Sequence, residues 1–287
     1  MSPTFKAALW MVGSIASFSC MAILGRELAA ELDTFEIMLY RSVFGFVIVV
    51  VLAGMTGSWR QINTRHMPVH LVRNMAHFVG QNLWFYAVTV IPLAQVFALE
   101  FTSPIWVIVL SPFLLGERLT AMRLLAAGMG FIGILMVARP DISGINIGVV
   151  MAASSAIFFA LTIMFTKRLT RTQSTTCILF YLTTMQLIFG VIAAGFDGDI
   201  ALPTSQGLPF VMLVGAAGLV AHYCMTNALS IAPATVVVPF DFIRLPAIAV
   251  IGMLLYNEAL DIWVLIGAII IFAGNYLNIW SETRQRN

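Results

Sequence analysis

The stretch Tyr86–Glu117, YAVTVIPLAQVFALEFTSPIWVIVLSPFLLGE, occurs twice in the chain. Shifted by 141 residues, it meets Asn227–Glu258, NALSIAPATVVVPFDFIRLPAIAVIGMLLYNE, without a gap. Glu100 then falls on Asp241, so both copies carry an acid at the same place inside an apolar run. The same shift also aligns Ser14 with Ser155, Leu28 with Leu169, Tyr40 with Tyr181 and Gly133 with Gly274. One offset for the whole chain indicates a duplicated unit, with residues 1–141 as the first repeat and residues 142–287 as the second.

The composition places the chain in lipid. Of its 287 residues, 60% are hydrophobic and only 10% are charged, whereas soluble domains carry roughly 25% charged residues. Apolar runs of about 20 residues, the length that spans a bilayer, are expected at 7–25, 35–54, 70–90, 93–115, 120–138, 146–166, 175–195, 208–230, 234–256 and 261–280. The sequence therefore predicts an all-α polytopic membrane protein with ten transmembrane helices, five in each repeat.

The basic residues predict the orientation. With the amino terminus inside, the cytoplasmic segments hold 11 Lys and Arg residues, and the outer segments hold two, Arg26 and Arg139. Because cytoplasmic loops of membrane proteins are enriched in Lys and Arg, both termini are expected in the cytoplasm of a cell whose plasma or inner membrane holds the chain. Five helices per repeat is an odd number, so the second repeat enters the membrane from the opposite face. Such inverted repeats are typical of transporters.

Four ionisable residues lie inside the expected spans: Arg41, Glu100, Asp241 and Arg244. Each costs roughly 2.5–3.5 kcal/mol at the centre of a bilayer, so such groups pair with one another or face water. Arg244 follows Asp241 by three residues and shares a helix face with it, and Arg41 is expected to reach Glu100. Two interpretations stay open: buried ion pairs that fix helix packing, or a substrate site or gate.

Further polar residues fall on matching positions of the two repeats. The side chains of His77, Gln81 and Trp84 share one helix face, and the shift of 141 places Gln81 on His222 and Ser103 on Arg244. Any one of them alone is explained by a hydrogen bond to a neighbouring helix, but the symmetric set favours a shared water-filled cavity. The expected cavity residues are Ser14, His77, Gln81, Trp84, Glu100, Ser103, Ser155, Phe159, His222, Asn227, Asp241 and Arg244, with Trp106 as a further apolar contact.

Prolines and small residues distinguish other spans. Pro104, Pro112, Pro239 and Pro246 interrupt spans 93–115 and 234–256, which predicts either cavity walls that move or static kinks. Spans 120–138 and 261–280 are rich in Gly and Ala, which favours close helix packing, within the chain or between two protomers of a homodimer.

Enzyme chemistry has little support in the sequence. No GxSxG, HExxH, Walker or GxGxxG pattern occurs in a usable context. The three cysteines, Cys20, Cys177 and Cys224, have no metal or pairing spacing. We therefore expect no catalytic residue, no cofactor, no bound metal and no nucleic-acid partner; the expected partners are a small-molecule substrate and the lipid bilayer.

The chain resembles the EamA branch of the drug/metabolite transporter superfamily. The resemblance covers essentially the whole chain and is carried by the two five-helix repeats, the short AxxxIPxA hairpin entry, the acid of span 93–115 and the helix end LxGExL at residues 114–119. The second repeat departs from it with Asn257 before Glu258. Within the family, the chain looks closest to the YddG-type amino-acid exporters.

The resemblance implies a secondary transporter that exports small metabolites, most specifically amino acids and among them aromatic ones, by alternating access through a cavity between the repeats. Arg244 or Arg41 would meet a carboxylate, and Glu100 or Asp241 would meet an amine. A multidrug or cationic-compound exporter is the first alternative, since acids and aromatic rings suit a cation. An intramembrane enzyme or scaffold is the second.

Overall fold

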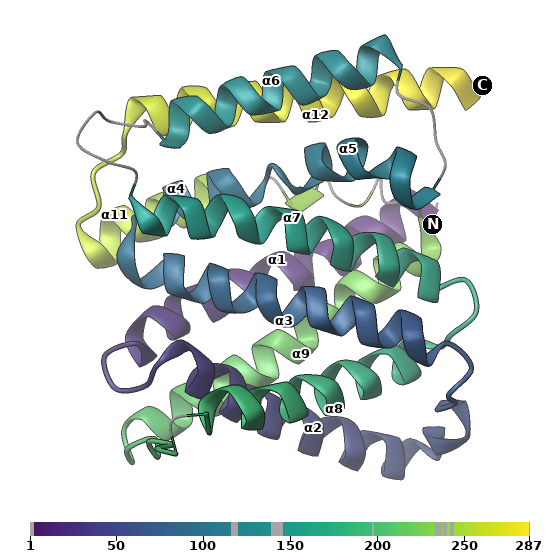
Figure 1. Ribbon diagram of the computed structural model, residues 1–287, viewed down its shortest axis with the longest axis vertical. Coiled ribbons are helices and arrows are strands. Elements are labelled where there is room, and N and C mark those ends of the chain that lie inside the picture. Colours follow the sequence, from purple (N-terminus) through teal and green to yellow (C-terminus); the bar gives the residue numbers. More distant parts are fainter. Residues whose placement is uncertain are drawn as a thin grey trace.

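The computed structural model describes residues 3–115, 120–138, 146–196, 198–232, 237, 240–241 and 244–286, and every regular element in them is helical (Figure 1). The first half supplies α1 Pro3–Leu28, α2 Thr34–Thr56, the short 3-10 helix η1 Ser58–Gln61, α3 Met67–Val90, α4 Leu93–Glu100, α5 Ser103–Leu115 and α6 Ala121–Ala138. The second half supplies α7 Ile147–Leu169, α8 Thr175–Ala194, α9 Gly207–Ile231, α11 Arg244–Tyr256 and α12 Ile262–Arg286. The all-α prediction is confirmed for these residues; Glu117, Pro233 and Pro239 lie outside them.

Six helical segments of the described part are long and apolar enough to cross a membrane: Phe5–Leu28, Thr34–Thr56, Leu93–Leu110, Ile147–Leu169, Thr175–Ala194 and Gly207–Ile231. Shorter apolar stretches follow at Leu124–Val137, Arg244–Tyr256 and Ile262–Leu277. Helix α3 has a suitable length of 24 residues but carries several polar side chains. A count of ten spans and the cytoplasmic position of both termini stay predictions.

Local sequence explains where the helices begin and end. Asp33 caps α2 by accepting a hydrogen bond from the backbone N–H of Glu36, whose carboxylate accepts one from the N–H of Asp33, each at 2.8 Å. This reciprocal arrangement satisfies two N–H groups that a helix start leaves unpaired. Helix α3 ends at Val90, with Ile91 as its C-cap residue, because Pro92, the N-cap residue of α4, cannot continue the helix.

The expected span 93–115 is two helices rather than one. Helix α4 ends at Glu100, and Phe101 and Thr102 form a turn before α5 begins at Ser103. Pro104 follows directly and has no N–H to continue the hydrogen-bond ladder of α4. The freed carbonyls are used locally, because the Thr102 hydroxyl donates to Leu99 O at 2.7 Å and the Ser103 hydroxyl donates to Glu100 O at 2.6 Å. The break between α4 and α5 therefore directly follows Glu100.

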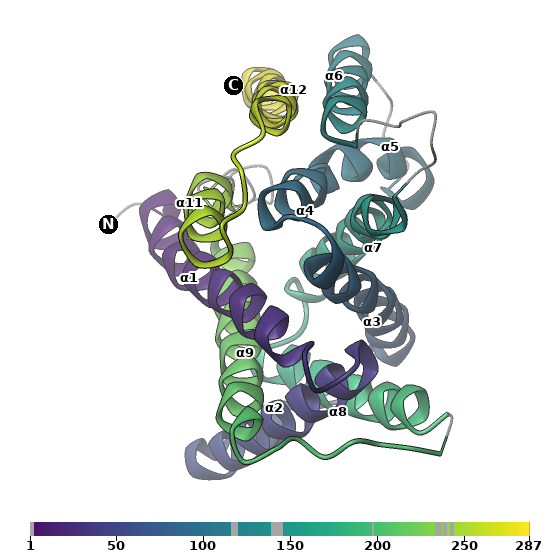
Figure 2. The same ribbon diagram turned by 90° about the vertical axis from the view of Figure 1, so that its left-hand side faces the viewer.

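The two halves interleave. Helix α1 packs along α9 and α3 along α7, and these two pairs are exchanged by the shift of 141; α2 packs on α8, and α6 on α12 (Figure 2). Ala7 and Met11 near the start of α1 lie against Leu229 at the end of α9, and Lys167 at the end of α7 also bonds to Leu229. The start of α1 and the end of α7 therefore lie at the same end of the bundle, so the equivalent helices run in opposite directions, as an inverted repeat requires.

Small residues let α6 and α12 approach closely. A Cβ added to Gly133 would lie 2.8 Å from the carbonyl oxygen of Gly267, and one added to Gly274 would lie 2.9 Å from that of Ala126. These glycines therefore serve packing within the chain, at the side of the bundle where Figure 2 shows the two helices together. The homodimer stays a prediction.

Candidate functional site

A buried charged trio joins the two halves in the centre of the bundle. The guanidinium of Arg244, at the start of α11, donates to Glu100 Oε1 at 2.6 Å and to Asp241 Oδ2 at 2.8 Å. Trp84 of α3 donates its indole N–H to the second oxygen of Glu100 at 2.7 Å. The side chain of Arg244 is only 2% exposed, and each acid is 14% exposed. With both carboxylates ionised, two acids on one guanidinium give the trio one net negative charge.

Aromatic rings surround the Arg244 guanidinium. Its central carbon lies 4.7 Å from the ring centre of Phe97, 5.2 Å from that of Phe18 and 5.4 Å from that of Phe101. Ring faces attract cations within about 6 Å, so these contacts stabilise the buried charge in addition to its carboxylates. They also build an apolar wall that suits a flat ring or an onium group.

Two imidazoles lie next to the trio. His77 of α3 and His222 of α9 stand edge to face with ring centres 4.6 Å apart. Phe18 packs edge-on against His222 at 5.4 Å, and Phe159 lies 6.4 Å from His77. The histidines thus come from equivalent helices of the two repeats, and the aromatic wall continues past them.

The trio, the imidazoles and the aromatic rings line one cavity. About 80 Å³ of it is free for the centre of a water-sized sphere, and the cavity is partly open to solvent. The lining residues are Phe18, Met21, His77, Gln81, Trp84, Glu100, Phe101, Ser103, Pro104, Phe159, Thr162, Ile163, His222, Met225, Asp241 and Arg244.

The cavity wall follows the sequence repeat. Twelve of its residues form six pairs related by the shift of 141: Phe18 with Phe159, Met21 with Thr162, Gln81 with His222, Trp84 with Met225, Glu100 with Asp241 and Ser103 with Arg244. Two pairs keep their chemistry, Phe18 with Phe159 and Glu100 with Asp241, whereas the other four pairs differ. An asymmetric ligand therefore meets a different set of groups from each half.

Several buried polar atoms of the wall have no hydrogen-bond partner among the described residues. These are both ring nitrogens of His77, Nε2 of His222, Oε1 of Gln81, Oδ1 of Asp241 and Nε of Arg244. A buried polar atom without a partner costs roughly 1–3 kcal/mol. A polar ligand in this cavity can satisfy these atoms.

Nine of the twelve expected site residues line this cavity: His77, Gln81, Trp84, Glu100, Ser103, Phe159, His222, Asp241 and Arg244. Ser14, Ser155 and Asn227 do not, and neither does Trp106. The hydroxyl of Ser155 donates to Ala152 O within its own helix at 2.7 Å. Asn227 donates to Tyr223 O at 2.8 Å and accepts from Thr175 at 3.4 Å. The polar groups of Ser155 and Asn227 thus bond within or between helices and serve helix packing.

The expected pairing of Arg41 with Glu100 is wrong. Arg41 lies on α2, which packs on α8 and α9, and it lines a separate small pocket with Thr183 and Gln186. Its guanidinium, with 3.6 Å from Nη1 to the sulfur of Met38, reaches neither acid of the trio. Glu100 is bound by Arg244 instead.

Sequence reasoning missed seven lining residues: Phe18, Met21, Phe101, Pro104, Thr162, Ile163 and Met225. Most are apolar, and an apolar side chain carries no signal in a chain that is apolar throughout. Three of them could have been predicted from the repeat, however. Shifting Phe159 and Trp84 by 141 gives Phe18 and Met225, and Met21 lies one helical turn after Phe18.

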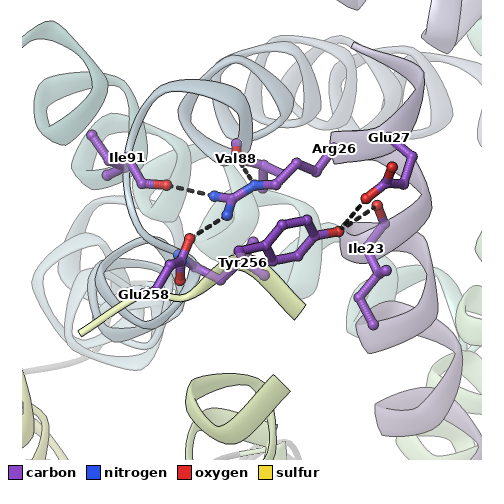
Figure 3. Close-up of polar contacts among 8 residues, drawn as sticks. Ile23, Arg26, Glu27, Val88, Ile91, Tyr256 and Glu258 are labelled. Atoms are coloured by element: carbon purple, nitrogen blue, oxygen red, sulfur yellow. Dashed lines mark hydrogen bonds and ion pairs between the residues drawn. The ribbon is translucent and has the colours of Figure 1, made fainter. Parts of the chain in front are cut away.

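A second polar network joins the end of α1 to residues that follow α3 and α11 (Figure 3). Arg26, in the last turn of α1, forms an ion pair with Glu258, which follows α11, and donates to Val88 O at 2.7 Å and Ile91 O at 2.6 Å. Glu258 also accepts the backbone N–H of Leu93 at 2.9 Å.

Tyr256 lies beside this ion pair, as Figure 3 shows. Its ring lies 4.8 Å from the Arg26 guanidinium carbon, and its hydroxyl bonds to Glu27 at 2.8 Å. The network therefore ties α1 and α3 of the first half to the end of α11.

Comparison with known proteins gives a consistent picture. The family model described as the EamA-like transporter family matches residues 5–139 and again residues 146–280. An S-adenosylmethionine uptake transporter of Rickettsia bellii is 24% identical over 275 residues, covering 96% of this chain and 94% of the relative. A riboflavin transporter of Rhizobium johnstonii is 29% identical over 282 residues, covering 97% and 92%. A pseudopaline exporter of Pseudomonas aeruginosa is 27% identical over 257 residues, covering 89% of each chain.

Proposed function

Because the chain belongs to the EamA-like transporter family, we propose that its central cavity carries an amino-acid metabolite with one net positive charge and a flat aromatic ring. The chain is a multi-pass inner-membrane transporter of small metabolites and not an enzyme. The substrate is the finer question, and the named relatives do not favour plain amino acids over other metabolites.

The charged trio carries the proposal. Arg244 offers the partner for a carboxylate, and Glu100 and Asp241 offer partners for an ammonium group. With one net negative charge, the trio favours a ligand that brings one net positive charge, since an uncompensated charge in a membrane interior is costly. The aromatic wall around Arg244 suits a ring or an onium group.

S-adenosylmethionine fits this description as a first test compound. It joins a carboxylate, an ammonium and a sulfonium, with one net positive charge, to a purine ring. A relative of similar length is named for its uptake. Riboflavin has the ring but neither a carboxylate nor an ammonium group, and amino acids such as phenylalanine are neutral overall.

Transport would proceed by alternating access between two inverted halves. We propose ten spans with residues 1–141 and 142–287 as the two repeats, both termini cytoplasmic, and the Arg26 network at the outer face. The resemblance implies export, but the relatives include both an uptake transporter and an exporter. The direction of transport is therefore to be measured in both orientations.

Counterflow in proteoliposomes tests the proposal. Radiolabelled S-adenosylmethionine is exchanged against unlabelled S-adenosylmethionine, S-adenosylhomocysteine, phenylalanine, riboflavin or a quaternary amine without a carboxylate. S-adenosylhomocysteine is the matched control, because it lacks only the methyl group and the sulfonium charge. We expect S-adenosylmethionine to compete at least about tenfold better, equivalent to about 1.4 kcal/mol. Equal competition by the quaternary amine favours the cationic-compound exporter instead, and better competition by phenylalanine favours an amino-acid exporter.

A further inference from the structure

Two basic residues make the same contacts at opposite ends of the molecule. Arg26 donates to the carbonyl oxygens of Val88 and Ile91, at 2.7 and 2.6 Å. Lys167 donates its ammonium to two carbonyl oxygens at the end of α9, at 2.6 and 3.1 Å. The partners of Lys167 are Leu229 and Ala232.

These contacts are equivalent under the repeat. The shift of 141 places Arg26 on Lys167, and it places Val88 on Leu229 and Ile91 on Ala232. The cation and both of its carbonyl acceptors are therefore at equivalent positions in the two repeats, although the cation is Arg in the first repeat and Lys in the second. We name these contacts the Arg26 cap and the Lys167 cap.

Each cap performs the same local task. The last carbonyls of a helix have no partner within it, and the negative end of the helix dipole favours a cation. Arg26 supplies this cation to the end of α3, and Lys167 supplies it to the end of α9. Each cap ties the first helix of a half to the third helix of the same half.

Each cap also lies just beyond the cavity. Met21 and Trp84 line the cavity and precede Arg26 and Val88 by five and four residues, which is about 6–8 Å along a helix. At the opposite end, Thr162 precedes Lys167 by five residues, and Met225 precedes Leu229 by four. The caps therefore stand at equivalent distances from the lining residues, one toward each end of the bundle.

The Arg26 cap has one further partner, and this partner comes from the other half. Glu258 follows α11, pairs with Arg26 and accepts the N–H of Leu93 at the start of α4. The arginine side chain and the acid are each 15% exposed, so water can replace either partner when they separate. Parting Arg26 from Glu258 opens a link between the halves while the cap within the first half remains.

We infer that Arg26 and Lys167 are equivalent positioning residues for transport, each capping the third helix of its half, and that release of Glu258 from the Arg26 cap opens that end of the cavity. This inference goes beyond the proposed function, because it does not depend on which metabolite is carried. It requires only an inward and an outward route, which inverted repeats provide.

Cysteine labelling tests it without a substrate. The three native cysteines are replaced by alanine, and Met21, which lines the cavity next to the Arg26 cap, becomes the reporter as Met21→Cys. An impermeant maleimide is applied to either face of sealed vesicles. Glu258→Gln should raise the labelling rate from the face at the Arg26 end by roughly three- to tenfold, since a partly exposed ion pair contributes modestly and minor conformers are populated at 0.1–10%. Lys167→Met should not raise labelling from that face.

A charge swap separates the cap from a simple ion pair. In the double variant Arg26→Glu with Glu258→Arg, an ion pair can form again, but a carboxylate at position 26 cannot donate to the carbonyls of Val88 and Ile91. We expect the swap to remain as open as Glu258→Gln, or more so. Should Glu258→Gln fail to fold, Glu258→Asp replaces it, with a smaller rise expected from the shorter carboxylate. Unchanged labelling in the folded Glu258 variant overturns the role of Glu258 in closure. A swap that restores closure overturns the positioning role of the cap, because the ion pair alone would then keep that end closed.

Discussion

Arg244 donates a hydrogen bond to Glu100 across the boundary between the two halves, with 2.6 Å between nitrogen and oxygen. The guanidinium also holds Asp241, which is the repeat equivalent of Glu100. One cation thus binds the two copies of a duplicated acid. Movement of the halves against each other would change the contact of Arg244 with Glu100 but not its contact with Asp241, which lies in the same half. We therefore expect the Arg244–Glu100 contact to link substrate binding with conformational change.

Removing one acid should impair transport without unfolding the protein. In Glu100→Gln, Arg244 keeps Asp241 as its ionic partner, so no charge is stranded, and we expect a stability loss of at most about 1.5 kcal/mol, the scale of one hydrogen bond. The lost charge removes the partner of the substrate ammonium, and transport should fall at least about tenfold. Asp241→Asn should behave alike. Thermal unfolding in detergent and counterflow measure the two effects, and normal transport by both amide variants would exclude these acids from the site.

Removing the shared cation should be far more damaging. Arg244→Met leaves two buried carboxylates with no cation between them, and breaking a buried pair in this way costs about 3–5 kcal/mol. Arg244→Lys retains the charge but not the planar guanidinium that reaches both acids. This variant should fold normally but transport poorly. Melting curves of the two variants provide the measurement. Equal stability of Arg244→Met and wild type would mean that the acids are held by other groups.

Gly218 should be required for the placement of Arg41. A Cβ at position 218 would lie 2.6 Å from Nε of Arg41, closer than real contacts allow. Gly218→Ala should therefore displace the end of this flexible side chain, at a cost near the low end of the roughly 1–3 kcal/mol of overpacking. In an Arg41→Met background, which replaces the guanidinium by a flexible side chain, the cost of Gly218→Ala should shrink. A double-mutant cycle by thermal unfolding gives this coupling. Additive effects would show that the two residues do not meet.

The inverted topology predicts opposite labelling of equivalent positions. Val90 and Ile231 are related by the shift of 141, are exposed and lie at the ends of α3 and α9. Cysteines placed there should react with an impermeant reagent from opposite faces of the membrane, Val90→Cys from outside and Ile231→Cys from inside, as the distribution of basic residues indicates. A reporter fused after Asn287 should read as cytoplasmic. Reaction of both cysteines from the same face would refute the inversion.

Much of the architecture was predictable because duplication repeats the information. Apolar runs of spanning length predicted the helices, and the offset that aligns Glu100 with Asp241 predicted matched polar positions, of which Gln81 with His222 and Ser103 with Arg244 line the cavity. What failed was the pairing of Arg41, since hydropathy gives the depth of a residue but not the helix that faces it. Span 93–115 illustrates another limit: Pro104 signalled an interruption, but the turn at Phe101 and Thr102 depends on hydroxyl groups that bond backward to Leu99 and Glu100.

The equivalence of Arg26 and Lys167 was also present in the sequence. It stayed hidden because the two residues differ in type and because neither carbonyl partner has a side-chain signature. Only the backbone contacts of α3 and α9 make the relationship visible.

A density map of the protein with bound S-adenosylmethionine tests the central claim most directly. We predict ligand density between the two halves, with the carboxylate within hydrogen-bond distance of Arg244, the ammonium against Glu100 or Asp241, and the purine ring along Phe18 and Phe159. Ligand density outside this cavity, with the trio unchanged and its polar atoms unengaged, would contradict the account.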